Sequence, residues 1–210
     1  MATPVTNVLN SAIKQGVWPT IFKTEYVTPV PKVFPLKKLK NLRSISGLMT
    51  FDKVFEKLLA QAMIEDMKEH IDPSQFGNQD GLATQHYLIK MIDKILSDTD
   101  TPEVTAVLAT FVDWNDAFPN QCPKLGIEAF QKCGVRNSLI PILIDFFKGR
   151  SIIVKWHGVQ SKQKDVNGGG PQGGLLGILE FLAQSNENAN SVPTDSRFKF
   201  VDNLTNLHNQ

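Results

Sequence analysis

The spacing of apolar residues predicts helices over much of the middle of the chain. After Ser46, apolar side chains recur three and four positions apart, which predicts a helix with one apolar face. We expect this face to consist of Phe51, Val54, Phe55, Leu58, Leu59, Ala62 and Met63. The same spacing predicts a helix over 84–96, with inward side chains at Leu88, Met91, Ile92 and Ile95. Two further helices are expected over 124–132 and 138–147.

Short runs of β-branched and aromatic residues predict the strands. In the basic segment 24–46, Pro29, Pro31 and Pro35 exclude a helix and favour an extended edge strand that enters a loop. The apolar run within 104–118 ends in an acid and predicts a buried strand.

Two pairs of strands are expected in the second half of the chain. Residues 151–159 and 161–166 predict two strands around a turn at Gly158. Residues 197–203 predict a strand that reaches a tight turn, with 204–207 as its returning partner. This mixture of strands and helices predicts an α+β fold, with helices packed on one face of an antiparallel sheet.

Composition excludes several classes of protein. The 210 residues could form one domain or two small ones, and the apolar content (41%) and charged content (20%) are typical of a globular chain rather than a disordered one. A net charge of only +1 does not by itself indicate a nucleic-acid binder, so local patches must carry that argument. Without an apolar run of about 18 residues or a signal peptide, we expect neither a membrane span nor secretion.

The two cysteines, Cys122 and Cys133, are too few for a disulfide framework. We expect them to be buried free thiols in a reducing compartment.

Two predicted strands end in an aspartate, at Asp113 and Asp202. If the strands are neighbours in one sheet, the two carboxylates converge at one edge and repel each other unless a cation lies between them. Mg²⁺ and Mn²⁺ are the ions that such oxygen ligands prefer. The alternative is that both are ordinary strand-end turn residues, and spacing alone favours this alternative.

A glycine-rich segment, NGGGPQGG, spans 167–174 and precedes an apolar helical run. Glycines allow a ligand to approach the backbone closely, and Gln172 can both donate and accept hydrogen bonds. The segment matches neither the dinucleotide fingerprint nor the phosphate-binding loop of nucleotide triphosphatases. Taken alone, it is better explained as a flexible turn before a helix.

In this order, the three elements resemble the reverse transcriptase family, in particular the polymerases of non-LTR retrotransposons. FVDWNDAF resembles the first palm motif of that family, GGGPQGGLLGILEFL resembles the second, and FVDN resembles the third. Upstream, TPVPKVF and LKNLRSISGLMTFDKVFEKLL resemble the fingers segment of the family. DPSQFGNQDGLAT resembles a second upstream segment of the family. The resemblance extends over about residues 15–207.

The resemblance implies a right-hand polymerase with two Mg²⁺ (or Mn²⁺) ions. Asp113 and Asp202 would be catalytic and would bind the metals, together with the backbone carbonyl of Val112 and with Asn203. The residues implied to bind nucleotide are Lys32, Arg43, Phe118, Gln172 and Gly173. Lys32 and Arg43 would neutralise the triphosphate, because ammonium and guanidinium groups stabilise phosphate charge.

Phe118 would be the steric gate that excludes a 2′-hydroxyl and so favours deoxynucleotides. Its alternative role is that of a plain core aromatic. Asn203 stands where the family usually has a second aspartate; it keeps a carbonyl oxygen but lacks the charge, which weakens divalent-ion binding.

We expect residues 1–100 to form a fingers-like region and 101–210 a partial palm, without a thumb because the chain stops soon after the third motif. The leading hypothesis is an RNA-directed DNA polymerase core, which uses an RNA template, a DNA primer and deoxynucleoside triphosphates inside the cell, in the cytoplasm or nucleus and not at a membrane. The alternative is a catalytically degenerate fragment that at most binds nucleic acid. An RNA-directed RNA polymerase is disfavoured, because its gate residue is usually smaller and more polar than Phe118.

Overall fold

The computed structural model describes residues 2–114, 117–170 and 173–210, which separate into two compact units. The first unit consists of Met1–His70 and Phe118–Ala183, and the second of Ile71–Ala117 and Gln184–Gln210. Each unit is therefore built from two separate stretches of sequence. The expected division at residue 100 into fingers-like and palm-like regions is a different partition, and it stays a prediction.

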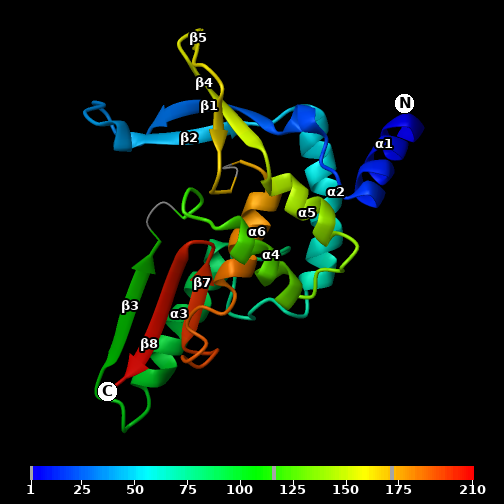
Figure 1. The fold of residues 1–210 in the computed structure, drawn as a ribbon. Helices are drawn as coiled ribbons and strands as arrows, with labels where there is room; N and C mark the ends of the chain where they lie inside the picture. Colours follow the sequence, from blue (N-terminus) through cyan, green and yellow to red (C-terminus); the bar gives the residue numbers. More distant parts are fainter. Residues whose placement is uncertain (1, 115–116, 171–172) are drawn as a thin grey trace. The chain divides into compact units, whose positions relative to one another are not determined.

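The sheet of the first unit is mixed. Strand β1 (Thr24–Pro31) lies between β2 (Leu42–Gly47), which is antiparallel to it, and β4 (Arg150–Trp156), which is parallel (Figure 1). Strands β5 (Val159–Gln160) and β6 (Lys164–Val166) both pair with β4 in the antiparallel sense. The predicted pair of strands around Gly158 is thus present, with the returning strand divided into two short pieces.

The basic segment 24–46 contains two strands rather than the one edge strand expected. β4 pairs with β1 only as far as Val27, whereas β2 pairs with it through Pro31. The backbone N–H of Lys32 donates to the carbonyl of Asn41 on the β2 side (2.7 Å). Because backbone N–H directions alternate along a strand, the positions of Pro29 and Pro31 face away from β2, where no strand is paired. The prolines therefore cost the sheet no hydrogen bond.

Helices form the rest of the first unit. These are α1 (Ala2–Gln15), α2 (Thr50–Met67), α4 (Pro123–Lys132), α5 (Ile140–Phe147) and α6 (Leu175–Ser185). Short 3₁₀ turns occur at Thr20–Phe22 and Leu39–Asn41. In the core, the ring of Trp18 stacks on Phe55 (centroids 4.6 Å apart) and meets Phe146 edge to face (4.7 Å). The helices expected after Ser46, over 124–132, over 138–147 and after the glycine-rich segment are all present.

The buried face of α2 differs from the expected one. Phe55, Leu59 and Met63 are buried as predicted, but Phe51 (63% exposed) and Leu58 (51% exposed) face outward, as does Val54. In their place the buried face includes Asp52, Glu56, Ala60 and Met67. The face that a helix buries depends on what it packs against, and here the Glu56 carboxylate accepts backbone hydrogen bonds inside the unit.

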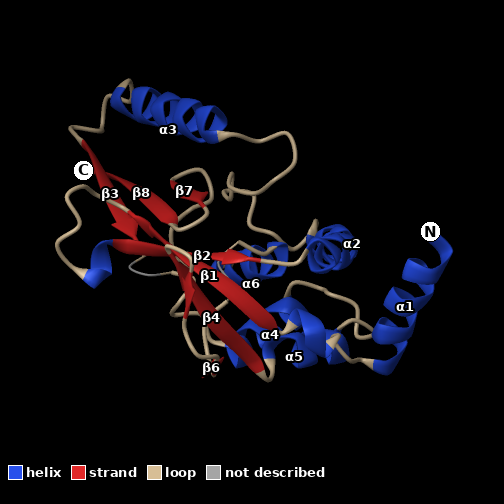
Figure 2. Cartoon of the chain, turned by 90° about the horizontal axis from the view of Figure 1, so that it is seen from above, coloured by secondary structure: helices blue, strands red, loops and turns tan. Residues whose placement is uncertain are grey.

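The second unit is a three-stranded antiparallel sheet with one helix on it. Its strand order is β3 (Val107–Asp113), β8 (Asn203–Asn209) and β7 (Arg197–Phe200), and α3 (Thr84–Thr99) lies along one face (Figures 1 and 2). Its core consists of Phe76, Tyr87, Met91, Phe198 and Leu207. The hydroxyl groups of Tyr87 and Thr205 are hydrogen-bonded at 2.6 Å, which ties the helix to the central strand.

Two burial predictions are wrong in the second unit. Strand β3 is an edge strand rather than a buried one, and its Leu108 (51% exposed) and Phe111 (69% exposed) lie open. On α3, Met91 is buried and Ile95 is half-buried as expected, but Leu88 and Ile92 are exposed. A single helix on a small sheet buries only a narrow stripe, so the wide apolar stripe of α3 is covered only in part.

A buried ion-pair cluster joins the beginning of the second unit to β7. Oδ2 of Asp72 lies 3.0 Å from Nε of Arg197 and 2.6 Å from Nζ of Lys199, and all three side chains are buried. Burial opposes ionisation of Asp72, but hydrogen bonds from Arg197, Lys199 and Ser74 outweigh it and hold the pKa of this carboxyl well below its usual range. Asp72, near the start of the second unit, thereby holds β7, which lies near the end of the chain.

The cysteines agree with expectation in part. Neither forms a disulfide, but only Cys133 is buried; Cys122 is exposed just before α4. Among the residues that the structure describes, no helix has the length and apolar character needed to cross a membrane.

Candidate functional site

The structure brings Asp113 and Asp202 to the same end of the sheet in the second unit. Asp113 is the last residue of β3 and pairs in register with Asn203, the first residue of β8. The turn between β7 and β8 places Asp202 next to Asn203, and its carbonyl accepts a hydrogen bond from the backbone N–H of Trp114 (3.3 Å). The two acids thus occupy neighbouring backbone positions although 88 residues separate them in sequence.

The turn that carries Asp202 is held in an unusual conformation. Val201 has a φ of 55°, which is a strained backbone conformation for a β-branched residue. Its N–H donates to Oε1 of the buried Gln75 (3.1 Å), which also accepts from the N–H of Gly77 (2.8 Å). A side chain at residue 77 would come within 2.6 Å of Val201, so the close approach requires glycine there. The strain is therefore supported by a specific contact, which is typical of functional turns.

The local groups suit a divalent cation that is also held by a substrate. Asp113 is exposed, Asp202 is half-buried, and Nδ2 of Asn203 donates to Oδ1 of Asp202 at 3.4 Å. Within the described residues, no cluster of three or more His, Cys, Asp or Glu side chains is arranged to hold a metal. Mg²⁺ is commonly bound by one or two carboxylates, with phosphates and waters completing its six positions, so two acids are compatible with it. The carbonyl of Val112, the residue before Asp113, belongs to the same strand end.

The remaining candidate residues belong to the first unit. Lys32 follows β1 and Arg43 lies in β2, opposite Val30; both side chains are exposed. Gln172 lies outside the described residues. Gly173 has a φ of 126°, and a side chain there would lie 3.0 Å from the carbonyl oxygen of Ser46. Gly173 therefore packs directly on β2, and glycine is needed at this position.

Phe118 and the glycine-rich segment are in contact. The backbone N–H of Gly170 donates to the carbonyl of Phe118 (3.0 Å), and that of Gly169 to the carbonyl of Gln121 (3.0 Å). A side chain at residue 170 would come within 1.9 Å of Oε1 of Gln121. The half-buried ring of Phe118 lies 5.9 Å from the ring of Phe181 on α6. Two motifs far apart in the sequence are thus joined by backbone hydrogen bonds.

A cavity of about 230 Å³ opens beside this segment. It is lined by Glu25, Val27, Ser44, Ser46, Pro119, Arg150, Ile152, Val166 and Gly168–Gly170. Inside it, Nη2 of Arg150 pairs with Oε1 of Glu25 at 2.6 Å, and both side chains are buried. Its volume is below that of a typical pocket for a whole small-molecule ligand. Residue spacing does not indicate Glu25 or Arg150, because their ion pair joins two strands that lie far apart in the chain.

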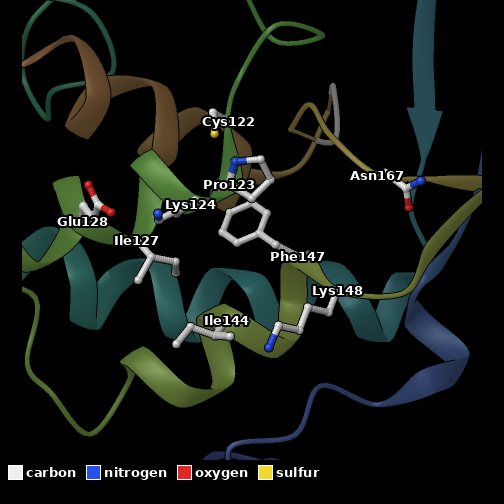
Figure 3. Close-up of a pocket in the computed structure, with 9 residues that line it drawn as sticks. All are labelled: Cys122, Pro123, Lys124, Ile127, Glu128, Ile144, Phe147, Lys148 and Asn167. Atoms are coloured by element: carbon white, nitrogen blue, oxygen red, sulfur yellow. The ribbon is translucent and has the colours of Figure 1, made fainter.

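A second, larger cavity of about 520 Å³ lies between α4 and α5 (Figure 3). Its apolar wall comes from Pro123, Ile127, Ile144 and Phe147, and Figure 3 shows the ring of Phe147 turned toward Pro123. The polar lining residues are Cys122, Lys124, Glu128, Lys148 and Asn167. Of these residues, Asn167 alone belongs to a motif singled out in the sequence, because it begins the glycine-rich segment 167–174.

Comparison with known proteins gives one informative sequence match. The chain is 28% identical over 186 residues to a probable RNA-directed DNA polymerase from transposon X-element of Drosophila melanogaster. The match covers 87% of this chain and 20% of that protein, so the chain spans about a fifth of the length of this relative. A scan against models of protein families finds no match.

Solved structures share the fold. Apo telomerase from Candida tropicalis matches with a TM-score of 0.60 at 12% identity, over 98% of this chain and 44% of that one. A form of the same telomerase truncated from its C-terminal domain matches with a TM-score of 0.58 at 11% identity, over 97% and 48%. The α+β class is thereby confirmed. The resemblance of this chain to the reverse transcriptases of non-LTR retrotransposons, first indicated by its three ordered motifs, is confirmed by its transposon relative.

Proposed function

We propose that this chain is the core of an RNA-directed DNA polymerase, which adds deoxynucleotides to the 3′-hydroxyl of a DNA primer on an RNA template. The observation that carries the proposal is the convergence of Asp113 and Asp202 at one end of the second unit's sheet. The sequence match to a transposon-encoded RNA-directed DNA polymerase supports it. Residues 1–100 would act as fingers and 101–210 as part of the palm.

Asp113 and Asp202 would hold two Mg²⁺ or Mn²⁺ ions, together with the carbonyl of Val112 and the amide oxygen of Asn203. Bound there, such ions would lower the pKa of the primer hydroxyl and neutralise charge on the triphosphate. The two carboxylates would hold the metal ions at the strand ends. The hydrogen bond from the Val201 N–H to Gln75 would keep the turn, and with it Asp202, in position.

Lys32 and Arg43 would neutralise the phosphates of the incoming nucleotide. The sugar would lie against Phe118, while Gln172 and Gly173 would line the nucleotide pocket beside β2. The contact between Gly170 and Phe118 supports this grouping, because it links the proposed gate to the glycine-rich segment.

Primer extension on an RNA template with Mg²⁺ tests the proposal. Asp113→Asn or Asp202→Asn should reduce extension at least about 100-fold, because each removes a charge required at the reacting phosphate. Asp93→Asn, on the exposed face of α3, serves as the matched control and should extend as the parent chain does. Extension that persists in both Asp113→Asn and Asp202→Asn contradicts the assigned centre.

The second candidate is a degenerate chain that binds nucleic acid without catalysis. Asn203 favours it, because the site has one charge fewer than two adjacent aspartates would give. Calorimetric titration with Mn²⁺ and a deoxynucleoside triphosphate separates the two functions. Metal-dependent nucleotide binding by the chain supports the polymerase, and its absence together with retained RNA binding supports the degenerate chain.

A further inference from the structure

A buried carboxylate from α2 reaches the first turn of α6. Glu56 is 1% exposed, and its Oε2 accepts hydrogen bonds from the backbone N–H of Leu175 (2.6 Å) and of Leu176 (3.4 Å). These are the first residues of α6, and they directly follow the glycine-rich segment 167–174. None of the sequence motifs had assigned a role to Glu56.

This contact supplies a hydrogen-bond acceptor to the first N–H groups of α6. The first N–H groups of a helix have no partner within the helix, and a negative charge at this end is favourable. A local capping side chain would normally supply the acceptor, but Gly174, which precedes Leu175, has none. Glu56 supplies the acceptor from a helix more than 100 residues earlier in the chain.

Gly174 packs directly against the carboxylate of Glu56. A Cβ atom at residue 174 would lie 2.7 Å and 2.8 Å from the two carboxylate oxygens of Glu56. Only glycine therefore leaves room for this carboxylate. One residue earlier, a Cβ atom at residue 173 would lie 3.0 Å from the carbonyl oxygen of Ser46. The end of the glycine-rich segment is thus held at two adjacent points, by β2 and by α2.

The charges around Glu56 come from several elements. Asp52 lies one turn earlier on α2, and Arg150 is on β4, where it is paired with Glu25 on β1. Burial is the main cause that raises the pKa of Glu56 to about 7, and the charge of Asp52 adds to it. The N–H groups of Leu176 and Leu175 and the charge of Arg150 act in the opposite direction.

We infer that Glu56 is a positioning residue, whose carboxylate fixes the start of α6 and thereby the placement of Gly173 and Gly174. Glu56 is buried and bonded to backbone N–H groups, so its proposed role is to position the segment rather than to bind the nucleotide directly. The consequence for nucleotide binding rests on the proposed function, in which Gly173 lines the nucleotide pocket. The structural part stands on the contacts alone.

Amide hydrogen exchange measures the structural part directly. In Glu56→Ala, the protection of the Leu175 and Leu176 amides should fall at least about tenfold, because both lose their acceptor. Glu56→Gln keeps one acceptor oxygen and should give an intermediate value, and Glu65→Gln, exposed on the same helix, should change nothing. Unchanged protection in a folded Glu56→Ala protein overturns the inference. If that variant does not fold, parental protection in Glu56→Gln at pH 8 overturns it, because the lost charge must weaken the contact.

The pH dependence distinguishes positioning by a charge from simple packing. In the parent chain, protection of the same two amides, corrected for intrinsic exchange, should increase as pH rises from 6 to 8 and Glu56 ionises. The corrected protection should be independent of pH in Glu56→Gln. A parent profile without this increase contradicts the role of the carboxylate.

Titration with Mn²⁺ and dTTP tests the functional part. Glu56→Ala should weaken dTTP binding at least about tenfold, Glu56→Gln should restore part of it, and Glu65→Gln should match the parent. Equal affinity in Glu56→Ala and the parent overturns the link to the nucleotide. If the parent itself does not bind dTTP, the proposed function fails, whereas the exchange experiment still decides whether Glu56 holds α6.

Discussion

Asn203 sets how much negative charge the chain offers at the end of the β3–β8 pair. It faces Asp113 across the ladder and donates a hydrogen bond to Asp202, so it contributes an amide where a carboxylate would fit. An amide oxygen can bind a divalent ion but does not add charge, and ligand charge is a main determinant of affinity. The site is therefore expected to bind metal weakly in the absence of a nucleotide.

Asn203→Asp should tighten Mn²⁺ binding about tenfold, because it adds a third carboxylate to the same strand end. Without metal the same change should lower the thermal stability, since Asp202 and Asp113 then repel the new charge. Calorimetric titration of Mn²⁺ measures the first effect. Asn209→Asp, at the other end of β8, is the matched control. An equal gain in that control would mean that only the net charge matters.

Phe118 should control the choice of sugar. Phe118→Val opens the space proposed to exclude a 2′-hydroxyl, so the preference for deoxynucleotides over ribonucleotides should fall at least about tenfold in primer extension. The change also removes the contact with Phe181, so the melting temperature must be measured alongside. Phe147→Val, in the separate cavity between α4 and α5, should leave the preference unchanged. An unchanged preference in Phe118→Val would identify Phe118 as a core residue only.

At the scale of elements, helical periodicity located α2 and α3 well but not the face that each buries. Apolar spacing is a local property, so it marks where a helix forms. It cannot distinguish Met91, which is buried, from Leu88 and Ile92, which are exposed. The narrow contact of α3 with its sheet decides this, and the sheet is assembled from strands far away in the sequence.

Alanine substitutions on α3 test the observed face. Met91→Ala should lower the free energy of unfolding by about 2–5 kcal/mol, because Met91 belongs to the core of the second unit. Leu88→Ala, on the exposed face, should change it by no more than about 0.5 kcal/mol. Denaturant unfolding measures both variants. A larger cost for Leu88→Ala than for Met91→Ala would restore the face expected from the sequence.

Across the whole molecule, buried carboxylates should make the two units respond to pH in opposite ways. Burial raises the pKa of Asp52 to about 6; the charge of Arg150 opposes this shift and that of Glu25 adds to it. Burial likewise raises the pKa of Glu56 to about 7. The folded first unit thus retains protons that the unfolded chain releases, so its stability falls as pH rises from about 4 to 7. Asp72 has a lowered pKa, so its contribution to the second unit is present above about pH 4 and lost as pH falls further.

Hydrogen exchange resolved by segment should reveal this difference. Between pH 7 and pH 5, after correction for intrinsic rates, protection should increase in the first unit, except at the Leu175 and Leu176 amides, whose charged acceptor is lost. In the second unit it should stay nearly constant. Glu56→Gln should reduce the change in the first unit, because the amide does not titrate. Equal responses in both units would contradict this assignment of the pH dependence.

Asp72→Asn should remove the contribution of the ion-pair cluster at every pH. It leaves Arg197 and Lys199 buried without their carboxylate, which should cost about 3–5 kcal/mol of stability at pH 7. Denaturant unfolding at pH 7 measures it. Asp80→Asn, an exposed position in the same unit, is the control and should be nearly neutral.

The sequence by itself determined the order and type of most elements and the motifs that indicate a polymerase. Local spacing, proline positions and strand-end acids are properties of neighbouring residues, so they can be seen without a fold. For the same reason, the two strand-end acids could be singled out before their proximity was known.

Only the tertiary structure decided which residues meet. The register that places Asp113 opposite Asn203, the contact of Glu56 with Leu175, and the burial of Asp72 beside Lys199 all join segments separated by long stretches of chain. The exposure of β3 likewise follows from its place at the edge of a three-stranded sheet. The environment of a side chain depends on such distant neighbours, and residue spacing carries no information about them.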